Sequence, residues 1–187
     1  MEIPKNIYFK LRPLILPINK IISQIPVEAN ILDLGCGKGL LLNYLKNYES
    51  YTGVDLNLSS NKIKIKNVNF IRDDCVKYTN QNLNQFDTFL IIDLLHHLNP
   101  DSQLNFLKDL LNKIKKNDII IIKDILPKNL FTKFWNSFHD LIVSKQIINY
   151  FNFKEFEINL SADYKIVDRF YKRIFLYDHY FLIIKKK

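Results

Sequence analysis

Cysteine is scarce in this sequence. The chain of 187 residues contains two cysteines, Cys36 and Cys75, and neither belongs to a CxxC pair or stands near a histidine cluster. Zinc sites and disulfide frameworks are built from closely spaced groups of such residues. The sequence therefore predicts neither kind of site, and we expect no metal centre and a reducing, cytoplasmic environment.

Long apolar runs are also missing. No stretch approaches the roughly 20 apolar residues that a membrane-spanning helix requires. Near the N-terminus, Glu2, Lys5 and Lys10 and three prolines break up the apolar residues, which is unlike a secretory signal peptide. We therefore expect a soluble protein without a membrane span.

The net charge of +8 suggests a nucleic acid or another polyanion as partner, because positive charge attracts polyanions. The lysines are nevertheless scattered along the chain, and the run Lys185–Lys187 fits a solvated tail. Nucleic acid thus stays an alternative partner that the charge alone does not favour. With 48% hydrophobic and 25% charged residues, the composition predicts one globular domain over 1–187.

Short apolar runs alternate with longer helical patterns, which indicates an α/β fold with a parallel sheet. The helix after Asn99-Pro100 is marked by a good N-cap followed by proline. A second long helical pattern follows Pro127, and two adjacent strands near the C-terminus predict an antiparallel hairpin. The predicted strands are 30–34, 51–55, 68–72, 87–92, 118–123, 164–173 and 178–185, and a helix is expected over 40–46.

Glycine is scarce too, and three of the four glycines stand together as Gly35-x-Gly37-x-Gly39. They follow the first predicted strand, and glycines in such a turn let backbone amides approach a ligand closely. A plain tight turn is the alternative. The spacing differs from the Gly-x-Gly-x-x-Gly that places a pyrophosphate on a helix, and Asp33 beside the turn would repel phosphate. We infer a ligand with a positively charged amino-acid end.

Acidic residues end the next two predicted strands. Asp55 stands where a carboxylate accepts hydrogen bonds from ribose hydroxyls, and Asp73-Asp74-Cys75 stands where an acid and a following amide would contact adenine. Each acid alone fits a capped or solvated turn. Their joint placement at the carboxyl ends of consecutive strands, where open α/β sheets bind ligands, favours a nucleoside site.

These motifs resemble those of the class I S-adenosylmethionine-dependent methyltransferases. ILDLGCGKG is similar to the first motif of that family, and the others follow in order across residues 29 to 125. They are YTGVDL, NFIRDDC, FDTFLIIDLLHHL and LLNKIKKNDIIIIKDI. One departure is Lys116-Asn117-Asp118, where the family usually has a Pro-Gly-Gly turn.

The resemblance implies a Rossmann-like seven-stranded sheet in the order 3-2-1-4-5-7-6, with strand 7 antiparallel and helices on both faces. It also implies an N-terminal helical cap over 1–28 and an acceptor-side lid over 126–163. The cofactor would be S-adenosyl-L-methionine, with S-adenosyl-L-homocysteine as product. Its implied binding residues are Asp33, Gly35, Cys36, Gly37, Asp55, Leu56, Asp74, Cys75 and Asp93.

Candidates for a catalytic base are few. His97 follows the fourth predicted strand beside the expected methyl group, Asp124 follows the fifth, and His139 lies in the helical pattern after Pro127. A base is needed only when the acceptor must lose a proton. In the family, a histidine at the position of His96 or His97 usually serves packing, so these assignments are hypotheses.

The aromatic stripe in the same helical pattern has two interpretations. Phe131, Phe134, Trp135 and Phe138 recur at helical spacing, which is typical of a helix covering a core. In the resembling family this region covers the acceptor, so the stripe would instead form an apolar pocket wall. Tyr8, Lys10 and Arg12 fit either a segment folded over the cofactor or a solvated terminus.

The leading hypothesis is therefore methyl transfer to a small-molecule or lipid-like acceptor. An RNA or protein methyltransferase is the alternative that the basic charge suggests, although Asp93-Leu94-Leu95-His96 lacks the Pro-Pro-aromatic clamp of enzymes that methylate nucleobase amines. A noncatalytic nucleoside-binding module and an NAD-dependent enzyme are less favoured. The sequence predicts no oligomeric state.

Overall fold

The structure, a computed structural model, describes residues 16–58, 65–81, 83–130, 132–134 and 148–187. Seven strands form one sheet in the order β3-β2-β1-β4-β5-β7-β6. The strands are β1 (Asn30–Leu34), β2 (Ser50–Val54), β3 (Val68–Ile71), β4 (Thr88–Ile92), β5 (Ile119–Ile125), β6 (Tyr164–Ile174) and β7 (Tyr177–Lys186). The predicted order is confirmed.

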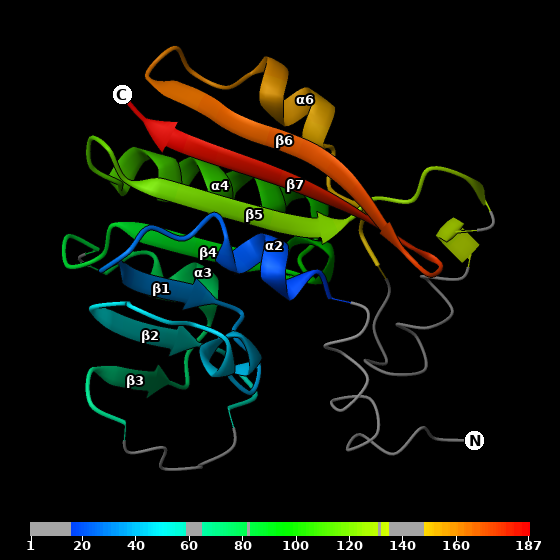
Figure 1. The fold of residues 1–187 in the computed structure, drawn as a ribbon. Coiled ribbons are helices and arrows are strands. Elements are labelled where there is room, and N and C mark those ends of the chain that lie inside the picture. The colour runs from blue at the N-terminus through cyan, green and yellow to red at the C-terminus, as the bar shows by residue number, and fades with distance from the viewer. Residues whose placement is uncertain (1–15, 59–64, 82, 131, 135–147) are drawn as a thin grey trace.

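Strand direction divides the sheet into two parts. β1 to β5 pair in parallel, whereas β7 is antiparallel to β5 and to β6. The carboxyl ends of the parallel strands consequently meet at one edge, on the right in Figure 1, and the tip of the β6–β7 hairpin projects beyond them. The predicted C-terminal hairpin is confirmed.

Helices cover both faces of the sheet, as predicted. One face packs against α2 (Ile18–Ile22) and the 3-10 helix η1 (Leu40–Asn43). The other packs against α3 (Cys75–Tyr78), α4 (Pro100–Lys113) and α6 (Phe153–Ile158), and it carries the larger apolar cluster. A further 3-10 helix, η2 (Leu95–His97), follows β4. Among the described helices, none has the length and continuous apolar character needed to cross a lipid bilayer.

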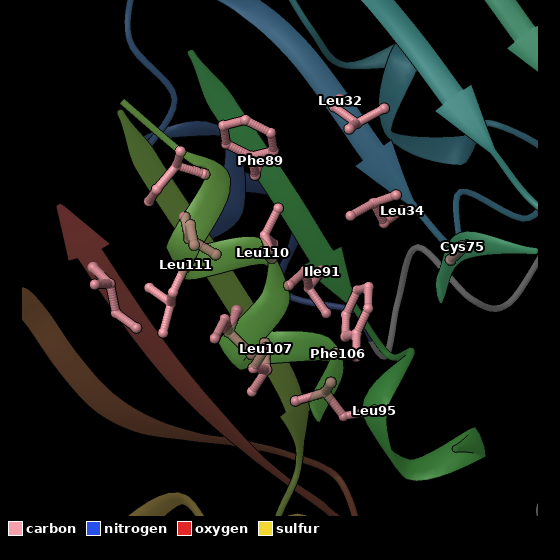
Figure 2. Close-up of a cluster of buried hydrophobic side chains, with 14 of the residues drawn as sticks. Leu32, Leu34, Cys75, Phe89, Ile91, Leu95, Phe106, Leu107, Leu110 and Leu111 are labelled. Atoms are coloured by element: carbon pink, nitrogen blue, oxygen red, sulfur yellow. The ribbon is translucent and has the colours of Figure 1, made fainter. Parts of the chain in front are cut away.

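Helix α4 shows how sequence pattern becomes packing. The Asn99 side chain accepts a hydrogen bond from the Ser102 amide at 2.8 Å and caps the helix, and Pro100 occupies its first turn. Phe106, Leu107 and Leu110 are fully buried against the central strands (Figure 2). This packing fixes β4 and β5, which carry the loops of the candidate site.

Two predicted elements differ from those observed by more than one residue at an end. The helix expected over 40–46 is the short η1, because Asn47 adopts φ 55 and turns the chain back, where its carbonyl accepts a hydrogen bond from the Glu28 amide at 2.6 Å. Strand β5 runs to Ile125 rather than ending at Lys123. Of the long helical pattern after Pro127, the described residues 130 and 132–134 are helical.

Candidate functional site

The glycine turn after β1 has the backbone geometry that the sequence predicts. Gly35, Gly37 and Gly39 all have positive φ, at 79°, 57° and 72°. A carbon atom added at Gly35 would lie 2.9 Å from Leu94, whereas one added at Gly37 would meet nothing within 4 Å. Gly35 therefore permits close packing, and Gly37 presents an open face of backbone to a ligand.

Asp55 links this turn to the end of β2. Its Oδ2 accepts a hydrogen bond from the Gly37 amide at 2.8 Å, and its Oδ1 accepts one from the Asn57 amide at 2.7 Å. Each carboxylate oxygen retains capacity for a further donor. Leu56, next in the chain, is 55% exposed and borders the same edge. The Asp55 carboxylate is thus a fixed acceptor that suits the two hydroxyl donors of a ribose.

Asp33 is buried on the face of the sheet that packs against α2. Its Oδ2 accepts a hydrogen bond from the Tyr51 hydroxyl at 2.6 Å. Burial, reinforced by the nearby Asp33 charge, raises the pKa of Tyr51 well above its usual value, so the phenol remains a donor. Asp33, Gly35 and Cys36 line a small cavity of about 30 Å³. A buried carboxylate at such a cavity suits an ammonium group.

Asp74 and Cys75 stand where β3 leads into α3. Asp74 is the N-cap of α3, and its Oδ1 accepts hydrogen bonds from the Val76 and Lys77 amides at 2.8 and 3.2 Å. The Cys75 thiol is buried and donates to the Val54 carbonyl at 3.5 Å. Because only Oδ1 of Asp74 serves the cap, its other oxygen could accept a hydrogen bond from an adenine edge.

Asp93, the residue after β4, has a strained backbone conformation. Its φ of 54° is unusual for a residue other than glycine, and such strain is often kept at functional sites. Its Oδ1 accepts a hydrogen bond from the Lys123 ammonium at 2.5 Å, and Lys123 is 1% exposed. The sequence reasoning missed this ion pair; its signal was a lysine inside the apolar strand Ile119–Ile125.

The structure brings Asp124 to His96 rather than to His97. Asp124 Oδ1 contacts His96 Nδ1, and Oδ2 accepts a hydrogen bond from the His96 amide at 3.1 Å. Both side chains are buried, whereas His97 is exposed with its ring centre 4.0 Å from that of His96. His139, the third predicted candidate, lies outside the described residues.

Polar atoms of Asp93, His96 and Asp124 lie within 4.8 Å of one another. Such a group has the spacing of metal ligands. Here, however, the Lys123 ammonium already places a positive charge on Asp93, and His96 already contacts Asp124. The site therefore contains two neighbouring pairs, Asp93–Lys123 and Asp124–His96, at the carboxyl ends of β4 and β5. We call them the acid–base pairs.

The predicted cofactor residues thus gather at one edge of the sheet, from the ends of four adjacent strands. An amino-acid ammonium, a ribose and an adenine would meet Asp33, Asp55 and the Asp74-Cys75 turn in that order. The residues present fit S-adenosylmethionine by the chemistry of these donors and acceptors. The open face at Gly37 would admit the bound molecule.

Comparison with known proteins agrees with this fold. The model of a family described as a methyltransferase domain matches residues 8–161. The chain therefore belongs to the methyltransferase domain family. Its sheet order and strand directions are those of the class I S-adenosylmethionine-dependent methyltransferase fold.

Individual relatives differ in what they methylate. An uncharacterised RNA methyltransferase of Mycoplasma mobile is 37% identical over 113 residues, which is 56% of this chain and 30% of that protein. N-methyltransferase 4 of Papaver somniferum is 32% identical over 107 residues, 51% of this chain and 30% of that protein. The chain thus spans less than a third of the length of these curated relatives.

A solved structure shares the fold over nearly the whole chain. It is the 1,6-didemethyltoxoflavin-N1-methyltransferase of Burkholderia thailandensis, crystallised with 1,6-didemethyltoxoflavin and S-adenosylhomocysteine. The TM-score is 0.72 at 16% identity, covering 96% of this chain and 81% of that one. The likeness is one of fold.

Proposed function

We propose that this chain transfers the methyl group of S-adenosylmethionine to a small-molecule acceptor. The observation that carries the proposal is the placement of Asp33, Asp55 and Asp74 at the carboxyl ends of adjacent strands, beside a glycine turn that is open at Gly37. Neither a plain tight turn nor a scaffold requires all three acids there.

The chain's own residues would hold the cofactor by distinct chemistries. Asp33 would pair with the ammonium group, Asp55 would accept from the ribose hydroxyls, and Asp74 with the Cys75 amide would bind adenine. The backbone of Gly35, Cys36 and Gly37 would line the methionine end, Leu56 would flank the ribose, and Asp93 would face the methyl-donor end. When bound, S-adenosylmethionine supplies an electrophilic methyl group on a sulfonium.

The protein's contribution to the reaction is alignment, with proton removal where the acceptor requires it. The buried Asp124 carboxylate contacts His96 Nδ1 and favours a proton on that nitrogen, so the basic lone pair of the neutral ring would be on Nε2. We therefore favour His96 over His97 as the base. Lys123 would hold Asp93 in place and balance its charge.

The names of two similar proteins support a small-molecule acceptor. The Burkholderia thailandensis protein is named as a 1,6-didemethyltoxoflavin-N1-methyltransferase and was crystallised with that compound, and the Papaver somniferum relative is named as an N-methyltransferase. RNA is the second candidate. The Mycoplasma mobile relative is named as an RNA methyltransferase, which favours it, and the net charge of +8 is compatible with it.

Calorimetry with S-adenosylhomocysteine tests the cofactor. We expect binding to the wild-type chain, a loss of at least tenfold in affinity for Asp55→Ala, and unchanged affinity for Asp109→Ala, an exposed control on α4. Absence of binding to the wild type would overturn the proposal. Comparable binding of NAD would favour a dehydrogenase instead.

Labelled S-adenosylmethionine tests the acceptor. The chain is incubated with extracts separated into lipid, RNA, protein and small-metabolite fractions. We expect label in small metabolites, and label confined to RNA would replace our acceptor class by the second candidate. Cofactor binding without transfer into any fraction would support the noncatalytic module.

A further inference from the structure

A second and larger cavity lies outside the cofactor residues. It has a volume of about 630 Å³ and is lined by Leu126, by residues of the segment 151–157, which contains most of α6, and by residues of β6 and β7. Ligand pockets of proteins typically have volumes of about 300 to 1,000 Å³. The space therefore suits a small molecule, and none of the predicted cofactor residues lines it.

The cavity is next to the acid–base pairs. Tyr180, which lines it, is the β7 residue paired in register with Asp124 of β5. On the other side, the Asn149 amide donates to the His96 carbonyl at 3.0 Å, just before Phe151 enters the cavity wall. The wall and the proposed base are thus fixed to each other.

Aromatic rings form most of the apolar wall. Phe153 packs edge-on against Tyr180 with ring centres 4.5 Å apart, and Tyr171 tilts against Tyr180 at 4.6 Å. Phe151 packs edge-on against Phe153 at 4.9 Å. The rings of Phe151, of Phe153 from α6, and of Tyr171 and Tyr180 from the hairpin thus form one continuous aromatic wall. Aromatic side chains bind planar rings well because stacked and edge-to-face contacts are both favourable.

The polar part of the wall has a surplus of positive charge. The acidic residue among the lining residues is Glu157, and it is already engaged: Tyr180 donates to Oε1, and Arg169 donates to Oε2 at 2.6 Å. Burial and the Glu157 charge raise the pKa of Tyr180 well above its usual value, which keeps it a donor. A cationic ligand would therefore find no unengaged carboxylate.

An anionic ligand, by contrast, would find donors. The Arg169 side chain is 63% exposed and uses one of its nitrogens for Glu157, so its remaining N–H groups can bind a carboxylate or phosphate. Lys154 adds a second exposed positive charge at the same cavity. We propose that this cavity binds the methyl acceptor, and that the acceptor is a planar aromatic molecule with a negatively charged group.

This inference rests on the proposed function, and a set of simple probes separates the two. 2-Naphthoate carries a planar ring and a charge, 2-naphthamide has the ring without the charge, and octanoate has the charge without the ring. We expect calorimetry on the S-adenosylhomocysteine complex to show 2-naphthoate binding at least tenfold tighter than either of the others. Equal affinities for 2-naphthoate and 2-naphthamide would overturn the proposal.

Matched variants assign the site. Arg169→Gln should weaken 2-naphthoate at least fivefold and leave 2-naphthamide unchanged. Lys165→Gln removes the same charge from an exposed position of β6 outside the cavity and should change neither. Unchanged 2-naphthoate affinity in Arg169→Gln, or an equal loss in Lys165→Gln, would contradict the assignment.

Two further outcomes separate the failures. If S-adenosylhomocysteine binds and 2-naphthoate does not, the cavity proposal fails while the proposed function stands. If S-adenosylhomocysteine itself does not bind, the proposed function fails. Displacement of 2-naphthoate by a short single-stranded RNA at equimolar concentration would show that the ring and anion recognised belong to a polynucleotide, and it would overturn a free acceptor.

Discussion

Single residues decide how the proposed base is held. A buried carboxylate that loses its hydrogen-bond donor costs about 1–3 kcal/mol. Glutamine at position 96 lacks a donor near the position of Nδ1, whereas asparagine retains one. We expect His96→Gln to lower the free energy of unfolding by about 1–3 kcal/mol and His96→Asn by less, as measured by urea denaturation.

His97→Gln is the control, because His97 is exposed. Surface substitutions usually change stability by at most about 0.5 kcal/mol. A larger loss for His97→Gln than for His96→Gln would mean that Asp124 depends on the other histidine, and the proposed base would have to be reassigned.

The two thiols offer a second test at this scale. Burial raises the pKa of Cys75 to about 12. Burial, with the charges of Asp33 and Asp55, raises the pKa of Cys36 still further above its usual value. Only the thiolate reacts with alkylating reagents. At pH 8.5 we expect iodoacetamide to alkylate the folded chain at least about a hundredfold more slowly than the urea-unfolded chain, whose thiols have a pKa of about 8.5.

The variants Cys36→Ser and Cys75→Ser report each thiol separately by mass spectrometry. Because the folded pKa lies above the unfolded one, the reaction of the folded protein should still accelerate above pH 9, where that of the unfolded chain levels off. Rapid alkylation of folded Cys75 at pH 8.5 would contradict the burial of its thiol against Val54.

The sequence did not predict which distant residues contact each other. Asp33 and Asp93 were recognised as site residues, but their partners Tyr51 and Lys123 were not. Tyr51 meets Asp33 because β1 and β2 pair in parallel, and Lys123 meets Asp93 because β4 and β5 do. Such pairs depend on strand register, which a sequence pattern does not specify.

At the scale of elements, we expect two glycines of the same turn to have different roles: Gly39 serves packing, and Gly37 serves ligand binding. A carbon added at Gly39 would lie 2.6 Å from the Phe70 ring, whereas Gly37 faces open space. Both alanines would suffer the strain of positive φ, about 1–2 kcal/mol. We expect Gly39→Ala to lose a further 1–3 kcal/mol or so through overpacking, in thermal or urea unfolding.

Gly37→Ala should show the opposite balance. Its added methyl group would occupy the open face of the turn, so S-adenosylhomocysteine affinity should fall more than stability does. Combining Gly39→Ala with Phe70→Leu should recover part of the lost stability. If Gly39→Ala is as stable as Gly37→Ala, the close packing of the turn on β3 is wrong.

Strands were predicted better than helices and strand ends. A parallel strand buried on both faces is a nearly continuous apolar run, as in Thr88–Ile92, and it is conspicuous in a sequence. The predicted strand ended at Lys123 because the two consecutive charged residues Lys123 and Asp124 are typical of a strand end, whereas β5 continues to Ile125. The two charged residues are buried in the strand because each has a partner of opposite or acid–base character.

For the whole molecule, the charge of +8 yields a prediction about RNA. Scattered lysines give weak binding that depends on counterion release. We expect a short single-stranded RNA to lose at least tenfold in affinity between 50 and 200 mM salt, without sequence preference, in fluorescence anisotropy. Tight and sequence-selective binding at 150 mM salt would favour the RNA alternative over a small acceptor.

The position of β7 has a consequence for synthesis on the ribosome. β6 is made first, but its neighbour in the sheet is β7, and the outer edge of β5 also waits for β7. β1 to β4, whose ends carry the predicted cofactor residues, can pair with one another as the chain emerges, whereas β5 and β6 lack a neighbour until β7 has been made. Until Tyr177–Lys186 has left the ribosome, the apolar edge strand Ile119–Ile125 of the nascent chain is exposed and can pair with strands of other chains.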